Sequence, residues 1–302
     1  MRREGEAQAG RRWSVGPIAS NVVVVAALLL AASQLPPDTS LRLIEERGSL
    51  RVCVPTTYPP LVYGSGSAQP GIDVELVREI GSRLGLRVQL APNSAIGKDF
   101  NPRNWRITRA QCEVIAGGVV ASVTTRSFLQ TTQPHLETGW AVVFADGERA
   151  LTGARVAFYA GTSGLDRIAL SRALRAAGSE VRIASSVDEL ERLLASGEVD
   201  AAVTESLLAR QIAYDGDYQA AWLPGLERSP LALGLWKGDL TLLRAVERVM
   251  DDMRRDGTLD ALLARYELQE LEACEACLPR EGSDPAAVVP APKPGDGARR
   301  LS

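Results

Sequence analysis

The stretch that decides the fold runs from Cys112 to Trp140 and reads CEVIAGGVVASVTTRSFLQTTQPHLETGW. A short apolar run leads to Gly117-Gly118, where the missing side chains let another molecule approach the backbone. A polar segment with a hydroxyl at Ser122 follows, and then comes Arg126. Because a guanidinium pairs bidentately with a carboxylate, a buried strand that leads through glycines to an arginine predicts a carboxylate pocket. The alternative is a surface arginine that follows a core strand.

Length and composition describe an ordinary globular protein. The 302 residues allow one large domain or two modest ones. Hydrophobic residues make up 45% and charged residues 24%, a balance typical of globular domains. The net charge of −3 and the aromatic content of 5% give no support to nucleic-acid binding. The single histidine, His135, argues against histidine-based metal sites and a Ser-His-Asp triad. We expect no cofactor and no nucleic-acid partner.

The N-terminus has the pattern of a secretion signal. Arginines precede an apolar run from Val22 to Ala32, whose length suits the core of a signal peptide better than a membrane span. Ala31-Ala32-Ser33 offers small residues for cleavage. The sequence therefore predicts a periplasmic or other extracytoplasmic protein, with residues 1–38 outside the folded body. The alternative is an uncleaved inner-membrane anchor that reaches from Ile18 to Leu35.

Strand and helix patterns alternate along the body of the chain. In the first half, residues 50–54 and 86–90 predict strands, and residues 72–84 predict a helix between them. The pattern restarts with a strand over residues 155–159. This alternation predicts an α/β protein with βαβ units and mostly parallel sheets flanked by helices. Residues 271–302 are expected to form a mostly disordered tail, because from about Gly282 the sequence is rich in proline, alanine and glycine without periodicity.

Short stretches in both halves form a pattern through their order and spacing. Those in the first half are Gly48-x-Leu50-Arg51-Val52, Tyr58-Pro59-Pro60, Gly71-Ile72-Asp73-Val74-Glu75-Leu76, the stretch with Arg126, and Thr132-x-Pro134. Those in the second half are Gly161-Thr162-Ser163, Gly197-x-Val199-Asp200-Ala201, Lys237-Gly238-Asp239 and Asp256-Gly257-Thr258. Together they resemble the periplasmic solute-binding proteins of family 3, the amino-acid-binding components of ABC importers. The resemblance covers about residues 41–268.

The resemblance implies a type II periplasmic-binding-protein fold, in which two α/β lobes are joined by two hinge strands and trap a ligand between them. It assigns residues 41–144 and 231–270 to lobe 1 and residues 145–230 to lobe 2. The restart of the strand pattern near Arg155 fits that partition independently. Hinge closure around a ligand is a familiar motion between domains.

The resemblance also implies roles in a ligand site. It implies that Arg126 holds an α-carboxylate from one lobe, and that Glu205 pairs with an α-ammonium from the other. The other residues implied in this way are Tyr58, which would cover the ligand, Gly118, Ser122, Thr162 and Ser163.

Each of these assignments has a structural alternative. Glu205 could be a charge stabilised by a helix dipole, Tyr58 a loop aromatic packed on the core, and the loop at Gly161 a simple turn. Glutamate replaces the usual aspartate at position 205, and His135 stands where a tyrosine is common. These departures leave the ligand open.

The four cysteines fall into two pairs. In the sheet that the resemblance implies, Cys53 and Cys112 lie on neighbouring strands, and export to an oxidising compartment makes a disulfide between them possible. The alternative is two buried thiols. Cys274 and Cys277 form a single C-x-x-C motif, which is weak evidence for zinc and fits a local disulfide better.

The leading interpretation is a monomeric solute receptor without enzymatic activity, which binds an amino acid or similar carboxylate and delivers it to the membrane subunits of an ABC importer. A second is a dehydratase on the same scaffold, similar to cyclohexadienyl dehydratases, with Glu205 as general acid. A third is a ligand-sensing accessory domain anchored to the membrane. The sequence does not identify the ligand.

Overall fold

The computed structural model describes residues 16–33, 38–64, 66–97, 100–145, 150–161, 165–266, 268, 271–274 and 277–278. The chain divides into two compact units, Met1–Thr39 and Ser40–Ser302.

The described part of the first unit contains helix α1 (Gly16–Ser33), which includes the apolar run expected from the sequence. Among the described residues, no helix is long and apolar enough to cross a membrane. The anchor alternative, Ile18 to Leu35, extends into residues outside the described ranges.

The second unit contains two lobes, each built on its own sheet. Lobe 1 has a six-stranded sheet with the order β2-β1-β3-β11-β4, in which β5 also pairs with β11. Its strands are β1 (Ser49–Val54), β2 (Arg87–Pro92), β3 (Val114–Val120), β4 (Leu129–Thr131), β5 (Leu136–Thr138) and β11 (Ser229–Trp236). Its helices are α2 (Ser40–Arg47), α3 (Ile72–Arg83), the 3-10 helix η1 (Pro102–Trp105), α4 (Val123–Phe128), α8 (Leu240–Arg255) and α9 (Thr258–Ala264).

Strand β3 lies inside the sheet of lobe 1, and every residue of its sequence VIAGGVV is buried. A strand covered on both faces needs such a continuous apolar run. On one face, Val114 and Val120 join the main core, which helices α3 and α8 complete. On the other face, Ile115 and Val119 pack in a smaller cluster with Trp105.

Lobe 2 has a five-stranded sheet with the order β10-β6-β9-β7-β8. Its strands are β6 (Trp140–Phe144), β7 (Arg155–Phe158), β8 (Glu180–Ile183), β9 (Ala201–Glu205) and β10 (Gln219–Trp222). Its helices are α5 (Arg167–Ala176), α6 (Val187–Ala195) and α7 (Ser206–Gly216). Strands β8 and β9 both pair with β7 in parallel, whereas β6 is antiparallel to β9 and β10.

The structure corrects two expectations: the boundary between the lobes and the mostly parallel pairing of the strands. The sequence assigned residues 41–144 to lobe 1, but β6 pairs with β9 and β10 and therefore belongs to lobe 2. The apolar run of β6 suits the core of either lobe, so its pattern alone could not show the boundary at Gly139. The sheets are mixed: the βαβ part of each is parallel, as expected, and strands β4–β6, β10 and β11 pair antiparallel.

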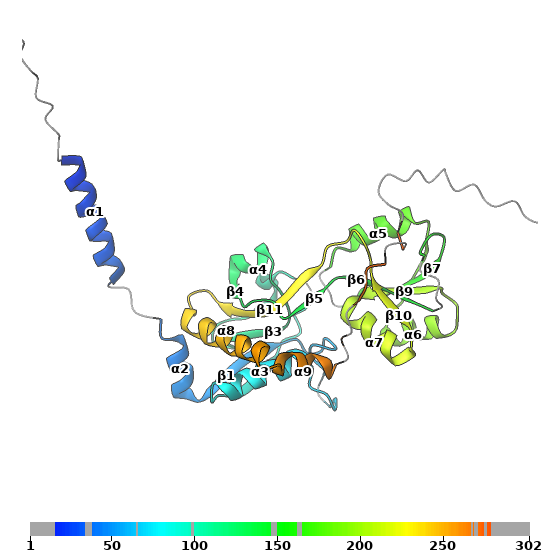
Figure 1. The fold of residues 1–302 in the computed structure, drawn as a ribbon, viewed down its shortest axis with the longest axis horizontal. Coiled ribbons are helices and arrows are strands. Elements are labelled where there is room, and N and C mark those ends of the chain that lie inside the picture. The colour runs from blue at the N-terminus through cyan, green and yellow to red at the C-terminus, as the bar shows by residue number, and fades with distance from the viewer. Residues whose placement is uncertain are drawn as a thin grey trace, which may run out of the picture. The chain divides into compact units, whose positions relative to one another are not determined.

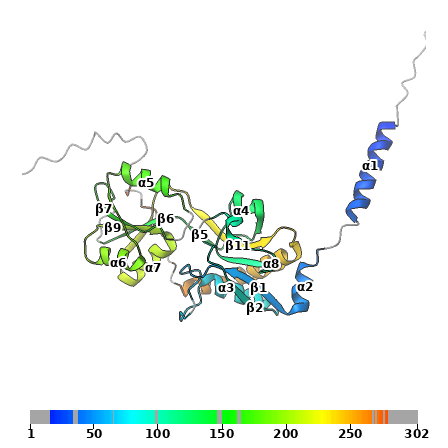
Figure 2. The same ribbon diagram turned by 180° about the vertical axis from the view of Figure 1, so that it is seen from behind.

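Two connections carry the chain between the lobes, from β5 to β6 and from β10 to β11 (Figure 1). Strands β5 and β11 lie side by side there in both views, with Thr138 paired to Ser229 (Figure 2). These paired strands occupy the position expected for the hinge.

A third crossing lies near the C-terminus, where the sequence predicted a tail over residues 271–302. After α9 in lobe 1, residues 271–274 return to lobe 2, where Ala273 pairs with Trp222 in parallel. Cys274 and Cys277 are joined by a disulfide and are buried in a core of lobe 2. The start of the tail is therefore a part of lobe 2, and residues 279–302 lie outside the described ranges.

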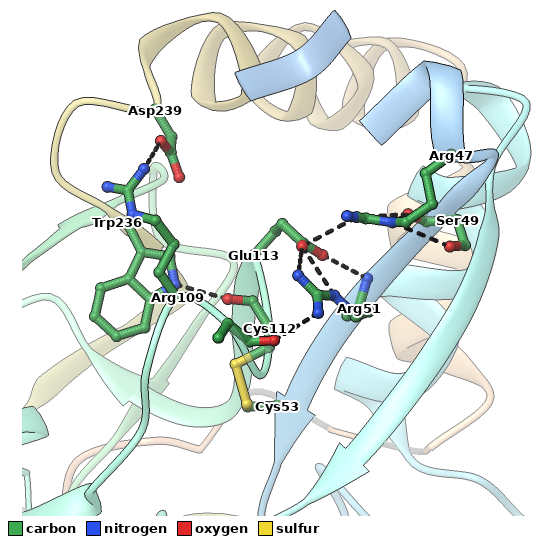
Figure 3. Close-up of polar contacts among 10 residues, drawn as sticks. Arg47, Ser49, Arg51, Cys53, Arg109, Cys112, Glu113, Trp236 and Asp239 are labelled. Atoms are coloured by element: carbon green, nitrogen blue, oxygen red, sulfur yellow. Dashed lines mark hydrogen bonds and ion pairs between the residues drawn. A yellow bond between two sulfur atoms is a disulfide. The ribbon is translucent and has the colours of Figure 1, made fainter. Parts of the chain in front are cut away.

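The predicted disulfide between Cys53 and Cys112 is present and links β1 to the residues just before β3. The indole Nε1 of Trp236 donates to the carbonyl of Cys112 at 2.7 Å, so β11 holds the same segment (Figure 3). Arg109, just upstream, pairs with Asp239 at the start of α8. The chain entering β3 is thus fixed to three neighbouring elements.

Glu113 follows Cys112, and its nearly buried carboxylate pairs with two partly exposed arginines (Figure 3). Its Oε1 accepts from Arg51 Nε at 2.9 Å and pairs with Arg47 at 3.0 Å. Its Oε2 accepts from the backbone N–H of Arg51 at 2.8 Å. One carboxylate thereby ties α2, β1 and β3 together.

Glu113→Gln is expected to lower the free energy of unfolding by about 2 kcal/mol, because it leaves two guanidinium groups without their carboxylate. Glu46→Gln is the matched control: Glu46 pairs with Arg42, but both side chains are more than half exposed, so the loss should stay below about 1 kcal/mol. Urea unfolding measures both variants. Equal losses would contradict the role assigned to Glu113.

Candidate functional site

The candidate site lies at the carboxyl ends of parallel strands. In open α/β sheets, ligands bind outside these ends, where the strand order reverses. In lobe 1 the reversal falls between β1 and β3, and in lobe 2 between β7 and β9. The residues at or just after the ends of these strands are 55–58, 121–122, 159–161 and 205–206.

Tyr58 packs directly on the end of β3. A Cβ added to Gly118, whose φ is +93°, would lie 2.5 Å from Cε1 of Tyr58, so only glycine lets the ring come this close. Only 5% of Tyr58 is exposed. This packing matches the alternative interpretation, an aromatic on the core, and contact with a ligand through Tyr58 or Gly118 stays a prediction.

A buried Asp-His pair supports the same strand end. Asp73 Oδ2 accepts from the backbone N–H of Gly117 at 2.6 Å, and Oδ1 lies 2.8 Å from Nε2 of His135. Both side chains are almost completely buried. His135 thus has a structural partner. Among the described residues, no group of three His, Cys, Asp or Glu side chains could hold a metal ion.

Ser122 and Arg126 lie on the short helix α4, which follows β3. The hydroxyl of Ser122 caps this helix by accepting from the backbone N–H of Thr125 at 3.1 Å. Arg126 is exposed, and its Nε donates to Oγ1 of Thr131 at 3.3 Å. Its guanidinium is therefore accessible to an anionic ligand.

Glu205 ends β9 in lobe 2 and caps helix α7. It is only 3% exposed, and its Oε1 accepts from the hydroxyls of Thr138 and of Ser206. Its Oε2 accepts from the backbone N–H of Leu208 at 3.3 Å. Burial raises the pKa of Glu205, while these hydrogen bonds act in the opposite direction. The side chain thus caps a helix, as the alternative interpretation expected, and reaches Thr138 on the connection between the lobes.

Gly161 follows β7 and has a φ of +57°. Thr162 and Ser163, expected to bind a carboxylate from lobe 2, lie outside the described residues. The structure therefore brings Glu205 close to the lobe junction. Among the described residues, no hydrogen bond or ion pair joins Arg126 to Glu205, and their joint contact with a ligand stays a prediction.

Phe100 is a candidate that the sequence analysis missed. It packs against the main core of lobe 1 and also against the core of lobe 2 that contains Trp140. Its carbonyl accepts from the hydroxyl of Thr125 at 3.5 Å, next to Arg126. The available signal was an aromatic residue in the polar loop from Ala91 to Asn104, a loop with no other phenylalanine, tyrosine or tryptophan.

Glu205→Gln is expected to remove a pH-dependent contribution to the free energy of unfolding. The stability that Glu205 contributes is fully present below its unfolded pKa, near 4.5, and is lost as the pH rises through its raised folded pKa. Relative to the variant, the wild type should therefore lose stability as the pH rises above the unfolded pKa. Each unit of the raised pKa corresponds to about 1.4 kcal/mol.

Urea unfolding at a series of pH values measures the effect. The matched control is Glu137→Gln on β5, an exposed glutamate close to Thr138 in sequence, whose curve should run parallel to that of the wild type. A constant difference between the wild type and Glu205→Gln at every pH would contradict the expected role of burial.

Comparison with known sequences identifies relatives of two kinds. The family model described as bacterial extracellular solute-binding proteins, family 3, matches residues 50–269. The chain is 24% identical over 269 residues to the L-cystine-binding protein TcyJ of Escherichia coli, a match that covers 86% of this chain and 96% of that protein. It is also 26% identical over 258 residues to the membrane-bound lytic murein transglycosylase F of Stutzerimonas stutzeri. That match covers 81% of this chain but 51% of the relative, so the chain spans about half the length of that protein.

Solved structures with the same fold confirm the predicted two-lobed α/β architecture. A substrate-binding protein of a polar amino acid ABC uptake transporter from Streptococcus thermophilus superposes with a TM-score of 0.62 at 17% identity. That match covers 76% of this chain and 89% of the other. An ancestral cationic amino acid solute-binding protein, AncCDT-1, gives a TM-score of 0.61 at 22% identity, over 75% of this chain and 99% of the other.

Proposed function

The chain belongs to the bacterial extracellular solute-binding proteins of family 3, and on that premise we propose that it captures a small carboxylate-bearing solute, an amino acid, between its two lobes. One observation supports the proposal: a loop aromatic and a buried carboxylate at the end of β9 both lie where the two lobes meet. Phe100 contacts the cores of both lobes, and Glu205 of lobe 2 accepts from Thr138 on the connecting strand.

In this proposal, the exposed guanidinium of Arg126 binds the carboxylate of the solute, and Ser122 adds a hydroxyl. Thr162 and Ser163 would contact the same carboxylate from lobe 2. Glu205 receives the ammonium group, and Phe100 covers the solute. Because Glu205 Oε1 already accepts from Thr138 and Ser206, its Oε2 is the oxygen better placed to accept from the ammonium.

We further propose that the protein works outside the cytoplasm as a monomer and delivers its solute to the membrane subunits of an ABC importer. Similarity to the L-cystine-binding protein TcyJ and to the substrate-binding protein of a polar amino acid ABC uptake transporter supports a transport role. The apolar run in α1 supports export.

A thermal-shift screen of amino acids and small carboxylates, followed by calorimetry on the hits, tests the proposal. We expect at least one amino acid to raise the melting temperature and to bind with a stoichiometry of one, because there is a single junction between the lobes. Absence of binding by all common amino acids and small carboxylates would contradict the proposal.

The burial of Glu205 favours a second candidate, a dehydratase of the cyclohexadienyl type. A carboxyl group with a raised pKa suits a general acid, and AncCDT-1 is described as a precursor of cyclohexadienyl dehydratase. Incubation with prephenate or arogenate distinguishes the two functions: turnover that is lost in Glu205→Gln supports the enzyme, and its absence supports the receptor.

The match to about half of a membrane-bound murein transglycosylase favours a third candidate, a ligand-sensing accessory domain. Sequencing the N-terminus of the exported protein separates these outcomes. A cleaved end near Ser33 supports a free receptor, whereas an intact α1 in the membrane fraction supports an anchored sensor.

A further inference from the structure

The hydroxyl of Tyr58 is buried without a hydrogen-bond partner in the part of the chain that the structure describes. Buried polar groups in native proteins are nearly always paired, and an unpaired one costs about 1–3 kcal/mol. An orphan hydroxyl at the junction of two lobes therefore needs an explanation, and the neighbouring acceptors provide one.

The ring of Tyr58 is held firmly in lobe 1. It packs against Gly118, and its Cδ1 lies 3.3 Å from the position that a Cβ on Gly97 would take. Its backbone forms a bridge with Val62, with hydrogen bonds of 2.7 and 2.9 Å in the two directions. The ring and backbone of Tyr58 are therefore fixed within lobe 1, and a group from the other lobe could serve as the missing partner.

Two carboxylates lie near Tyr58. Leu207, two residues after Glu205, belongs to the same core cluster as Tyr58, and Asp73 accepts from the backbone of Gly117, next to Gly118. Burial raises the pKa of Tyr58 well above its ordinary value, and the charges of Glu205 and Asp73 add to the effect. Asp73 belongs to lobe 1, and its oxygens are engaged by Gly117 and His135. Because Asp73 and Tyr58 sit in the same lobe, a motion between the lobes does not bring them together.

Glu205 is the acceptor that such a motion can deliver. It belongs to lobe 2, at the end of β9, whereas Tyr58 belongs to lobe 1. In this structure its Oε1 accepts from Thr138, which lies in β5 on the connection between the lobes. Thr138 is completely buried, so its hydroxyl holds Glu205 without competition from solvent.

We propose that Tyr58 and Thr138 are alternative donors to Glu205, and that the exchange between them couples closure of the lobes to ligand binding. In the present arrangement Thr138 donates to Glu205. When the lobes close, the Tyr58 hydroxyl donates to Oε1 and leaves Oε2 for the ammonium of the solute. Tyr58 is then a positioning residue that acts through Glu205. This inference rests on the proposed solute-binding function.

The proposal predicts effects of opposite sign for two substitutions. Tyr58→Phe keeps the ring and removes the orphan hydroxyl, so it should lower the fraction of closed molecules and weaken solute binding about tenfold, without a loss of thermal stability. Thr138→Val removes the competing donor, so the closed fraction should rise and binding should become no weaker. Thr138→Ser restores the hydroxyl and should behave as the wild type.

Distance measurements between the lobes test this without requiring a known solute. The four cysteines form the two disulfides, so cysteines introduced by Ser82→Cys on α3 and Ser171→Cys on α5, both exposed, can be labelled selectively. Electron spin resonance on the labelled full chain gives the fractions of open and closed molecules, with and without the amino-acid panel.

The outcomes separate the two proposals. A lower closed fraction in Tyr58→Phe together with a higher one in Thr138→Val supports the exchange. If the wild type closes when a solute binds, and the Tyr58→Phe variant has the same closed fraction, the exchange is overturned. Solute capture would then still be supported. The exchange is also overturned if Thr138→Val weakens binding as much as Tyr58→Phe does. Both residues would then stabilise the site in the same way and would not be alternative donors to Glu205. A single distance under all conditions contradicts solute capture by lobe closure, and the exchange with it.

Discussion

Arg126→Ala is expected to weaken solute binding by roughly 30-fold to several thousand-fold, because removal of one partner from a desolvated charge pair costs about 2–5 kcal/mol. Arg126 is exposed, and its Nε donates to Oγ1 of Thr131. The substitution should therefore leave the melting temperature almost unchanged. Calorimetry and thermal unfolding on the same variant measure the two effects separately.

Arg87→Ala provides the matched control. Arg87 is also exposed and also lies in lobe 1, but it stands at the amino end of β2, away from the strand ends that form the candidate site. Its removal should change affinity by less than twofold at physiological salt, since distant surface charges are screened. Equal effects of the two substitutions would remove Arg126 from the site.

Loss of the disulfide between Cys53 and Cys112 is expected to lower the free energy of unfolding by about 4 kcal/mol. The cysteines are 59 residues apart, and the bond removes the entropy of that loop from the unfolded chain. Both cysteines are buried in the cluster around Trp105, so serine in their place also leaves polar groups in an apolar site. Denaturant unfolding of the doubly substituted Cys53→Ser, Cys112→Ser protein measures the loss.

The second disulfide serves as its control. Cys274 and Cys277 are 3 residues apart, and in the same entropy model a loop this short contributes only about 1–2 kcal/mol. Substitution of this pair should therefore cost less. A larger loss for the short loop would show that the C-terminal segment, not the link between β1 and β3, dominates stability.

The sequence predicted those parts of the fold that periodic apolar patterns specify. The apolar run of β3, followed by Ser122 and Arg126, marked a central strand, and the site expected beside it stays a prediction. The position of Glu205 at the end of β9 was also predictable, because the strand pattern and the following helix are both local.

The parts that the sequence did not predict depend on long-range contacts. β6 has the same buried pattern as a lobe 1 strand, and only its pairing with β9 assigns it to lobe 2. The return of residues 271–274 to lobe 2 depends on pairing with Trp222 and on burial of Cys274 in a core of lobe 2. The burial of Tyr58 depends on Gly97 and Gly118, which are 39 and 60 residues away in the chain. No local pattern encodes such contacts.

Hydrogen exchange with and without the bound solute tests solute capture at the junction of the lobes. If the solute is held between the strand ends, amide exchange should slow in both lobes at once, over residues 118–126 in lobe 1 and over residues 159–161 and 205–208 in lobe 2. Slowing confined to one lobe, or to segments away from these strand ends, would contradict the account.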